Sequence, residues 1–208
     1  MKPFFSIVIA VYNRQKLISR AIKSVLNQDS NNWELLIVDD FSTDETKSVI
    51  KPFLVDKRLR YFKTELNSGV AIARNLGIRK AKGNYITFLD SDDEYRINHL
   101  SSRFELLKNN NIDLLHGGVE IVGYSKVPDK KDTSKLIEIS DCVIGGTFFI
   151  NSYLSNELIL FDENVNYSED SKMFEEFEKR ELNIVETEYK TYIYYRDTPD
   201  SICNTVNE

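Results

Sequence analysis

Long apolar runs alternate with segments of helical periodicity along the first 122 residues. The apolar runs lie at residues 4–12, 33–38, 59–64, 85–89 and 113–122, and the helical segments lie at 15–27, 43–54, 69–80 and 96–109. Runs that are apolar on both faces are typical of strands in the interior of a parallel sheet. The alternation therefore predicts an α/β fold with a central, mostly parallel sheet flanked by helices.

The rest of the chain is less regular and predicts a smaller part of mixed structure. Residues 125–135 are polar, contain one proline and four lysines, and indicate an exposed excursion. We expect strands at 136–139, 142–150 and 184–196, and an acidic helix at 168–180 with Met173, Phe174 and Phe177 facing inward. The length is that of one domain, which we expect to span residues 1–208.

Composition and charge exclude several classes of protein. The 208 residues carry 27 Lys and Arg against 33 Asp and Glu, and a net charge of −6 argues against a nucleic-acid partner. Two histidines and two distant cysteines, Cys142 and Cys203, exclude a zinc ribbon or a His-rich metal site. One disulfide and two free thiols both remain compatible with these cysteines.

The sequence shows no segment that marks a membrane or secreted protein. No apolar run reaches the roughly 20 residues of a membrane helix. The apolar N-terminal run leads directly into Tyr12 and Asn13 without a cleavage site, so we interpret it as a strand. We expect a cytoplasmic protein without an integral membrane segment.

Polar side chains gather where the predicted strands end. The residues at these positions are Asn13 and Arg14, Asp39 and Asp40, Asn67, and Asp90, Ser91, Asp92 and Asp93. Ligands of open α/β sheets bind outside the carboxyl ends of the strands, so this rim is the predicted ligand site.

The densest group is Asp90-Ser91-Asp92-Asp93. Two unit charges about 4 Å apart repel by roughly 1 kcal/mol in water and by several times that near a protein surface. A divalent cation relieves this repulsion, and carboxylates are the hard oxygen ligands that Mg²⁺ or Mn²⁺ prefers. The alternative is that Ser91 to Asp93 cap the following helix, but a cap needs one acid rather than three. We therefore predict a metal or ligand site here.

The pair Asp39-Asp40 precedes a predicted capping box, in which Ser42 is the N-cap and Glu45 the N3 residue. The capping box explains Ser42 and Glu45 but leaves both aspartates without a local role. We expect at least one of them to face the rim, where a carboxylate can accept a hydrogen bond from a base or a ribose.

Other polar residues have local explanations that compete with a role in binding. Asn13 is a natural N-cap for the helix after it. Arg74 lies on a helix of small residues that can pack closely against the sheet and hold this side chain near the rim. Glu169 and Asp170 follow Ser168, and by themselves they are best explained as acids in the first turn of a capped helix.

Five motifs in order resemble the inverting family 2 glycosyltransferases of GT-A fold. They are SIVIAVYN at 6–13, VDDFSTD at 38–44, NSGVAIARN at 67–75, YITFLDSDD at 85–93, and FDE at 161–163 followed by Glu169-Asp170. Each motif is weak by itself, but their order and spacing match over nearly the whole chain. The resemblance implies a GT-A fold and transfer of a sugar from a nucleotide-sugar, most commonly a UDP-sugar, with inversion at the anomeric carbon.

The resemblance also implies roles for individual residues. Residues 1–110 would bind the nucleotide-sugar, and residues 111–208 would bind the acceptor and supply the base. The implied donor-binding residues are Ala10, Val11, Tyr12, Asn13, Asp39, Asp40, Asn67, Arg74, Asp90, Ser91 and Arg196. Asp90 and Asp92 would hold Mn²⁺ or Mg²⁺, with Asp92 as the direct ligand, and Asp170 would be the catalytic base. The acceptor would be a glycan or a lipid-linked molecule, which allows contact with the inner face of a membrane.

Four other classes are tested by the same residues. A Rossmann oxidoreductase or a nucleotide-sugar pyrophosphorylase needs a glycine-rich turn after the first strand, where this chain has Tyr-Asn-Arg-Gln-Lys. A phosphatase with Asp90 as nucleophile and Asp92 as acid is a minor alternative. A relative that binds nucleotide-sugars or glycans without catalysis is the main alternative, and a base at Asp170 argues against it.

Overall fold

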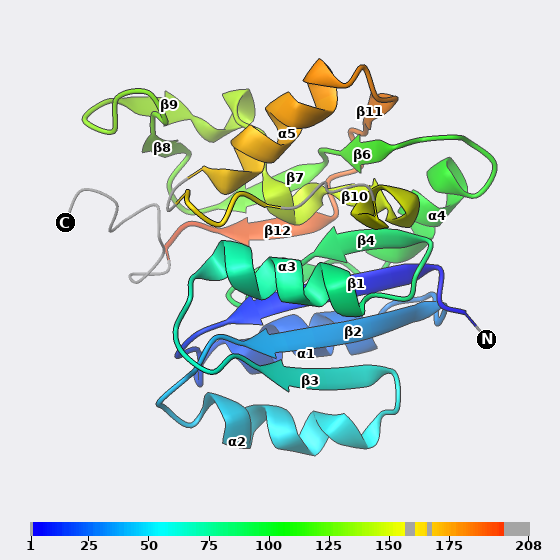
Figure 1. Ribbon diagram of the computed structural model, residues 1–208, viewed down its shortest axis with the longest axis vertical. Helices are drawn as coiled ribbons and strands as arrows, with labels where there is room; N and C mark the ends of the chain where they lie inside the picture. Colours follow the sequence, from blue (N-terminus) through cyan, green and yellow to red (C-terminus); the bar gives the residue numbers. More distant parts are fainter. Residues whose placement is uncertain (1, 157–160, 166–167, 198–208) are drawn as a thin grey trace.

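The computed structural model describes residues 2–156, 161–165 and 168–197, and its centre is a seven-stranded sheet (Figure 1). The strand order is β11-β6-β10-β4-β1-β2-β3. The strands are β1 (Phe5–Val11), β2 (Trp33–Asp39), β3 (Leu59–Lys63), β4 (Tyr85–Phe88), β6 (Leu114–His116), β10 (Phe149–Asn151) and β11 (Ile184–Glu186). Only β10 among them is antiparallel to its neighbours, so the carboxyl ends of β1, β2, β3 and β4 meet at one edge.

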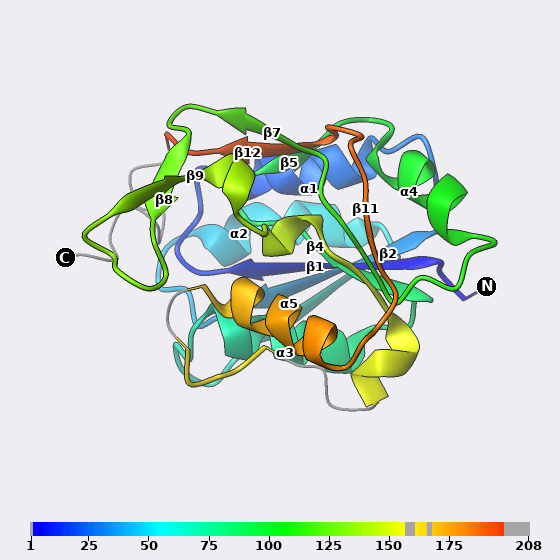
Figure 2. The ribbon, with the colours of Figure 1, turned by 90° about the horizontal axis from the view of Figure 1, so that it is seen from above.

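Helices cover both faces of this sheet (Figure 2). They are α1 (Ile18–Leu26), α2 (Thr46–Ile50), α3 (Val70–Lys80), α4 (His99–Leu107) and α5 (Glu169–Lys179). Ile7 and Ile9 of β1 belong to the core on the side of α1 and α4, whereas Val8 belongs to the core beneath α3 and α5. Alternate residues of β1 thus pack into the cores on opposite faces of the sheet, which explains why β1 is apolar at nearly every position.

Two smaller sheets stand beside the central one. The first has the order β5-β12-β7 and consists of β5 (Glu94–Tyr95), β12 (Tyr192–Tyr195) and β7 (Val119–Val122). The second is a hairpin of β8 (Lys126–Pro128) and β9 (Leu136–Glu138). The predicted exposed excursion is therefore a hairpin, and the side chains of Val127 and Pro128 are buried.

Two predicted strands of the second half prove to be interrupted. The segment 113–122 is divided between β6 and β7, which belong to different sheets. Gly117 and Gly118 separate them with φ angles of 89° and 75°, in the left-handed region that favours glycine. A Cβ on Gly118 would lie 2.2 Å from the carbonyl oxygen of Tyr189, so this crossing also requires a bare backbone.

The segment 184–196 is divided in the same way between β11 and β12. Of the predicted strand at 142–150, only its end is extended, as β10, after a 3₁₀ turn at Gly145–Thr147. Further 3₁₀ turns lie at Lys51–Val55, Ile139–Asp141 and Ser152–Asn156. Within the described ranges, no helix has the length and apolar character needed to cross a bilayer.

Candidate active site

A cavity of about 790 Å³ opens at the carboxyl ends of β1, β2 and β4. Residues from both halves of the chain line it, including the β8–β9 hairpin and the start of α5. The predicted site residues among its lining are Ala10, Val11, Tyr12, Asp40, Asn67, Arg74, Asp90, Ser91, Asp92 and Asp170. The fold thus brings together predicted site residues that are up to 160 positions apart, as Ala10 and Asp170 are.

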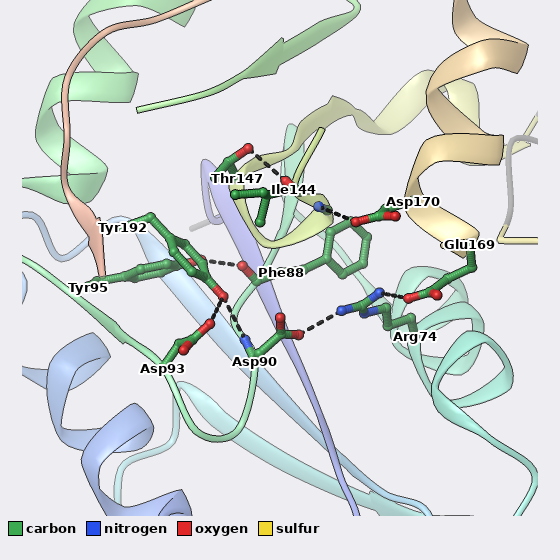
Figure 3. A network of polar contacts seen from close by, with 11 residues as sticks. Arg74, Phe88, Asp90, Asp93, Tyr95, Ile144, Thr147, Glu169, Asp170 and Tyr192 are labelled. Carbon is green, nitrogen blue, oxygen red and sulfur yellow. Dashed lines mark hydrogen bonds and ion pairs between the residues drawn. The ribbon is translucent and has the colours of Figure 1, made fainter. Parts of the chain in front are cut away.

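The turn Asp90–Asp93 forms the part of the cavity that follows β4. The amide of Asp93 donates to the carbonyl oxygen of Asp90 at 3.1 Å, which closes the turn. Asp93 is fully buried and points away from the cavity, where its carboxylate accepts hydrogen bonds from the Tyr192 hydroxyl at 2.7 Å and the Tyr195 amide at 2.8 Å (Figure 3). Asp93 therefore supports the turn, and the cavity receives only Asp90, Ser91 and Asp92.

Asp92 is the carboxylate of this turn that best suits a cation. Arg20 donates a hydrogen bond to its carbonyl oxygen, and the backbone amide of Asp92 itself stabilises the carboxylate. Burial, and after it the charge of Asp90, raises the pKa of Asp92 above its ordinary value, while Arg14 and Arg20 lower it. A positive charge bound beside Asp92 would relieve this penalty.

The donor set fits a cation whose coordination is completed by a substrate. Within the described residues, no three His, Cys, Asp or Glu side chains are grouped to enclose a metal ion. Mg²⁺ is commonly held by one or two carboxylates together with phosphate oxygens of the substrate. Asp92 and Asp90 supply the carboxylates for such a site but not a complete cage.

Arg74 connects this turn to the start of α5 (Figure 3). Its buried guanidinium donates to Asp90 at 2.6 Å and to Glu169 at 2.5 Å. Burial by itself disfavours the charge, but the two carboxylates outweigh it and raise the pKa of Arg74, which stays charged. The side chain also lies over the ring of Phe161, 5.1 Å from its centroid. Arg74 therefore fixes the two acidic segments relative to each other.

Asp170 follows Glu169 in the first turn of α5 and lies above Arg74 in Figure 3. One carboxylate oxygen accepts a hydrogen bond from the amide of Gly145 at 2.9 Å, and the other accepts from the amide of Ser171 at 2.7 Å. Burial, and after it the charge of Glu169, raises the pKa of Asp170 to about 6, against the opposing effects of Gly145 and Arg74. A carboxyl group with this pKa is ionised at neutral pH yet basic enough to accept a proton.

The two aspartates after β2 are used differently. Asp39 is fully buried outside the cavity lining and accepts hydrogen bonds from the Ser42 amide at 2.7 Å and the Tyr61 hydroxyl at 2.5 Å. Asp40 lines the cavity and accepts from the amides of Ser68 and Gly69. Asp40 therefore joins the loop before α3 to the end of β2, and it also lines the cavity.

Two local predictions about helix caps are wrong. The residue before α2 is Glu45, and Ser42 instead accepts a hydrogen bond from the amide of Asn13 at 3.0 Å. Asn13 does not cap α1, which begins after Leu17. Its side-chain oxygen accepts from the amides of Thr43 and Asp44, so Asn13 joins two rim loops. It does not line the cavity itself.

Arg196 is also outside the cavity lining. Its side chain is buried, and its guanidinium donates to the carbonyl oxygen of Lys126 at 3.4 Å, beneath the β8–β9 hairpin. The residues that follow Asp197 in the sequence, 198–208, lie outside the described residues. In the described conformation, Arg196 supports the hairpin.

The sequence did not indicate how much of the cavity the hairpin provides. Val127, Pro128, Ile137 and Ile139 form an apolar wall, and Lys130 at the tip pairs with Glu175 of α5 at 2.7 Å. Glu169 as the partner of Arg74, and Tyr192 as the partner of Asp93, were not foreseen either. Since each of these contacts joins segments distant in the sequence, no local pattern could have identified them.

Comparison with known proteins identifies the family of the chain. The family model described as "Glycosyl transferase family 2" matches residues 6–185, and the chain belongs to that family. One relative is the UDP-Glc:alpha-D-GlcNAc-diphosphoundecaprenol beta-1,3-glucosyltransferase WfgD of Escherichia coli. It is 37% identical over 146 residues, which are 67% of this chain and 56% of that protein.

Solved structures show the same fold. TarS (residues 1–349) of S. aureus in complex with UDP-GlcNAc has a TM-score of 0.78 at 21% identity, covering 98% of this chain and 61% of that one. The mannosyltransferase PcManGT from Pyrobaculum calidifontis, in complex with GDP-Man and Mn²⁺, has a TM-score of 0.77 at 16% identity, covering 99% and 60%. The predicted GT-A fold is confirmed. The matches cover between 56% and 61% of WfgD, of the TarS fragment 1–349 and of PcManGT.

Proposed function

We propose that this protein transfers a sugar from a nucleotide-sugar, with UDP as the first candidate, to a hydroxyl group of a glycan or lipid-linked acceptor. The observation that carries the proposal is the convergence of Asp40, Asp90, Asp92 and Asp170 on one cavity, with the pKa of Asp170 raised to about 6. Because the chain belongs to family 2 of the glycosyltransferases, we interpret these carboxylates as groups that take part in sugar transfer. The related glucosyltransferase acts on a diphosphoundecaprenol-linked GlcNAc, which supports a lipid-linked acceptor here.

The two halves of the chain take different parts in the proposed reaction. Residues 1–110 hold the nucleotide, with Asp40 and the strand end Ala10–Tyr12 toward the base and ribose. Residues 111–208 hold the acceptor and supply the base. We expect this activity in the cytoplasm, at the inner face of a membrane when the acceptor is lipid-linked.

The proposed transfer is a single displacement at the anomeric carbon. Asp170 takes the proton of the acceptor hydroxyl, whose oxygen forms the new bond to that carbon. The bond from this carbon to the diphosphate oxygen breaks on the opposite face, and its electron pair leaves with the diphosphate. Attack opposite to the leaving group inverts the configuration. General-base help of this kind contributes about 10²–10⁴-fold.

Negative charge grows on the departing diphosphate, which has to be stabilised next to Asp90 and Asp92. Asp92, with Asp90 as a second oxygen ligand, would hold Mn²⁺ or Mg²⁺, and the bound cation would neutralise this charge. The relative with GDP-Man and Mn²⁺ supports a divalent ion in this fold. Arg74 neutralises Asp90 from the protein side, so the turn does not repel the leaving group with two full charges.

Asp170 separates the proposal from its main alternative, a relative that binds nucleotide-sugars without catalysis. Binding does not need a carboxyl group with a raised pKa that is held by two backbone amides. The phosphatase alternative does not apply, because the chain belongs to family 2 of the glycosyltransferases.

Calorimetry with UDP, GDP and dTDP, with and without Mn²⁺, tests the donor site. We expect one nucleotide to bind more tightly when Mn²⁺ is present, and Asp92→Ala to lose that gain. Asp141→Ala is the matched control, since Asp141 is a carboxylate of the same cavity that follows β9 of the hairpin and does not belong to the Asp90–Asp93 turn. Nucleotide affinity that is independent of Mn²⁺ and of Asp92 would contradict the proposed metal site.

A further inference from the structure

The hydroxyl of Tyr192 joins the two ends of the Asp90–Asp93 turn (Figure 3). It accepts a hydrogen bond from the amide of Asp90 at 3.2 Å and donates one to the carboxylate of Asp93 at 2.7 Å. A tyrosine hydroxyl has one donor and two acceptor positions, so a single group can do both. One oxygen atom thus holds the backbone of the first residue and the side chain of the last.

Strand β12, which carries Tyr192, makes further contacts with the Asp90–Asp93 turn. The amide of Tyr195 donates to the other oxygen of Asp93 at 2.8 Å, and β12 pairs with β5, which begins directly after the turn. Tyr192 itself is fully buried. The turn therefore takes its position from a strand about 100 residues further along the chain.

The ring of Tyr192 also packs against the 3₁₀ turn that contains Gly145 and Gly146, and this turn holds Asp170, the proposed base. A Cβ on Gly146 would lie 2.4 Å from the Tyr192 hydroxyl oxygen, so the phenol rests directly on the backbone there. The preceding residue, Gly145, donates its amide to Asp170 at 2.9 Å, and a Cβ on Gly145 would lie 2.8 Å from the Cβ of Asp170. Tyr192 thus lies between the turn with Asp90 and Asp92 and the segment that orients Asp170.

From this arrangement we infer that Tyr192 is a positioning residue, which sets the Asp90–Asp93 turn in the geometry that receives the cation and the diphosphate. The inference rests on the proposed function, since it assigns a support to the proposed donor site. Tyr192 does not line the cavity and acts only through the turn. Residues that orient metal ligands in this way commonly contribute about 10–100-fold to metal affinity.

Tyr192→Phe removes only the hydroxyl, and Tyr195→Phe is its matched control. Tyr195 lies on the same strand, its hydroxyl donates to Glu94 at 2.7 Å, and its backbone contact with Asp93 survives the substitution. We expect Tyr192→Phe to weaken Mn²⁺ binding in the presence of UDP about 10–100-fold, measured by the paramagnetic resonance of free Mn²⁺. Nucleotide affinity without Mn²⁺ should stay within twofold of wild type, and Tyr195→Phe should change neither quantity.

Hydrogen exchange without metal gives an independent measurement of the same role. The Asp90 amide loses its acceptor in Tyr192→Phe, so a peptide covering residues 89–93 should exchange faster than in wild type or Tyr195→Phe. A Mn²⁺ affinity equal in all three proteins, or unchanged exchange at Asp90, overturns the inference. If the nucleotide affinity of the wild-type protein does not depend on Mn²⁺, the metal part of the proposed function fails. In that case, hydrogen exchange at the Asp90 amide alone decides the role of Tyr192.

Discussion

Residues 2–110 and residues 111–197 supply different walls of one cavity, but different contacts hold the two walls in place. In the first half, β1 and β2 are seven residues long and pair along their full length, so the rim follows directly from the sheet. In the second half, every strand has three or four residues, and the strands divide among three sheets, so that β6 and β7, like β11 and β12, belong to different ones. Short strands carry few ladder hydrogen bonds, so side-chain contacts must position that wall.

This difference between the two walls predicts which substitutions lower the free energy of unfolding and which lower the rate of the proposed reaction. The rim at the ends of β1 and β2 should be sensitive mainly to loss of core volume, whereas the Asp90–Asp93 turn after the shorter β4 depends on contacts from Tyr192 of the second half. A wall built on individual contacts, such as Gly145 to Asp170 or Tyr192 to Asp93, changes its chemistry when one contact is removed. The predictions below test this contrast.

The largest effect is expected at Asp170. Asp170→Asn removes the proposed base, so turnover should fall about 10²–10⁴-fold while nucleotide affinity stays near wild type. Initial rates of nucleotide release and calorimetry measure the two quantities. The control is Asp162→Asn, because Asp162 is paired with Lys172 of α5 near the surface and should affect neither. Full turnover in Asp170→Asn would reject the base.

Arg74 joins the two walls, and its removal should destabilise the protein most. Arg74→Met leaves Asp90 and Glu169 without their cation, and breaking a buried pair of this kind costs about 3–5 kcal/mol of unfolding free energy. Urea denaturation measures this loss. Arg79→Met on the same helix is the control, since Arg79 is about half exposed and lies 4.0 Å from Glu163. Its cost should stay below about 1 kcal/mol.

A pair of isoleucines compares the two walls directly. Ile37 is fully buried in β2, so Ile37→Ala should cost about 2–5 kcal/mol of unfolding free energy. Ile137 is only partly buried in the hairpin and lines the cavity, so Ile137→Ala should cost less than about 1 kcal/mol and raise the KM for the acceptor. Equal losses of stability in the two variants would contradict the contrast between the halves.

The smallest expected effect is a pH dependence. The pKa of Asp170 is raised to about 6, and the base works only when deprotonated, so kcat/KM should fall about tenfold per pH unit below pH 6. The sign for stability is the opposite. The raised pKa favours the protonated form in the folded state, so this carboxyl contributes stability below its ordinary pKa and loses it as pH rises to about 6. A rate profile that stays flat down to pH 5 would reject this assignment.

Much of the first half was predictable from local pattern. The runs at 4–12, 33–38, 59–64 and 85–89 correspond to β1, β2, β3 and β4, because strands buried on both faces need apolar residues at nearly every position. The polar residues after them come to one edge because parallel strands end together. The second half was less predictable, since its segments at 113–122 and 184–196 are divided between two sheets at glycines or loops that no periodicity marks.

The sequence by itself determined the class of fold, the strand ends and the acidic residues gathered there. The reason is that local patterns of apolar and polar residues indicate which segments are buried strands and where they end. Only the tertiary structure decided which acids face the cavity. It turned Asp93 toward Tyr192, gave Asp90 and Glu169 a shared cation in Arg74, and placed Asp170 against Gly145. Each of these outcomes joins segments between 16 and 99 residues apart, and long-range packing rather than local preference selects such partners.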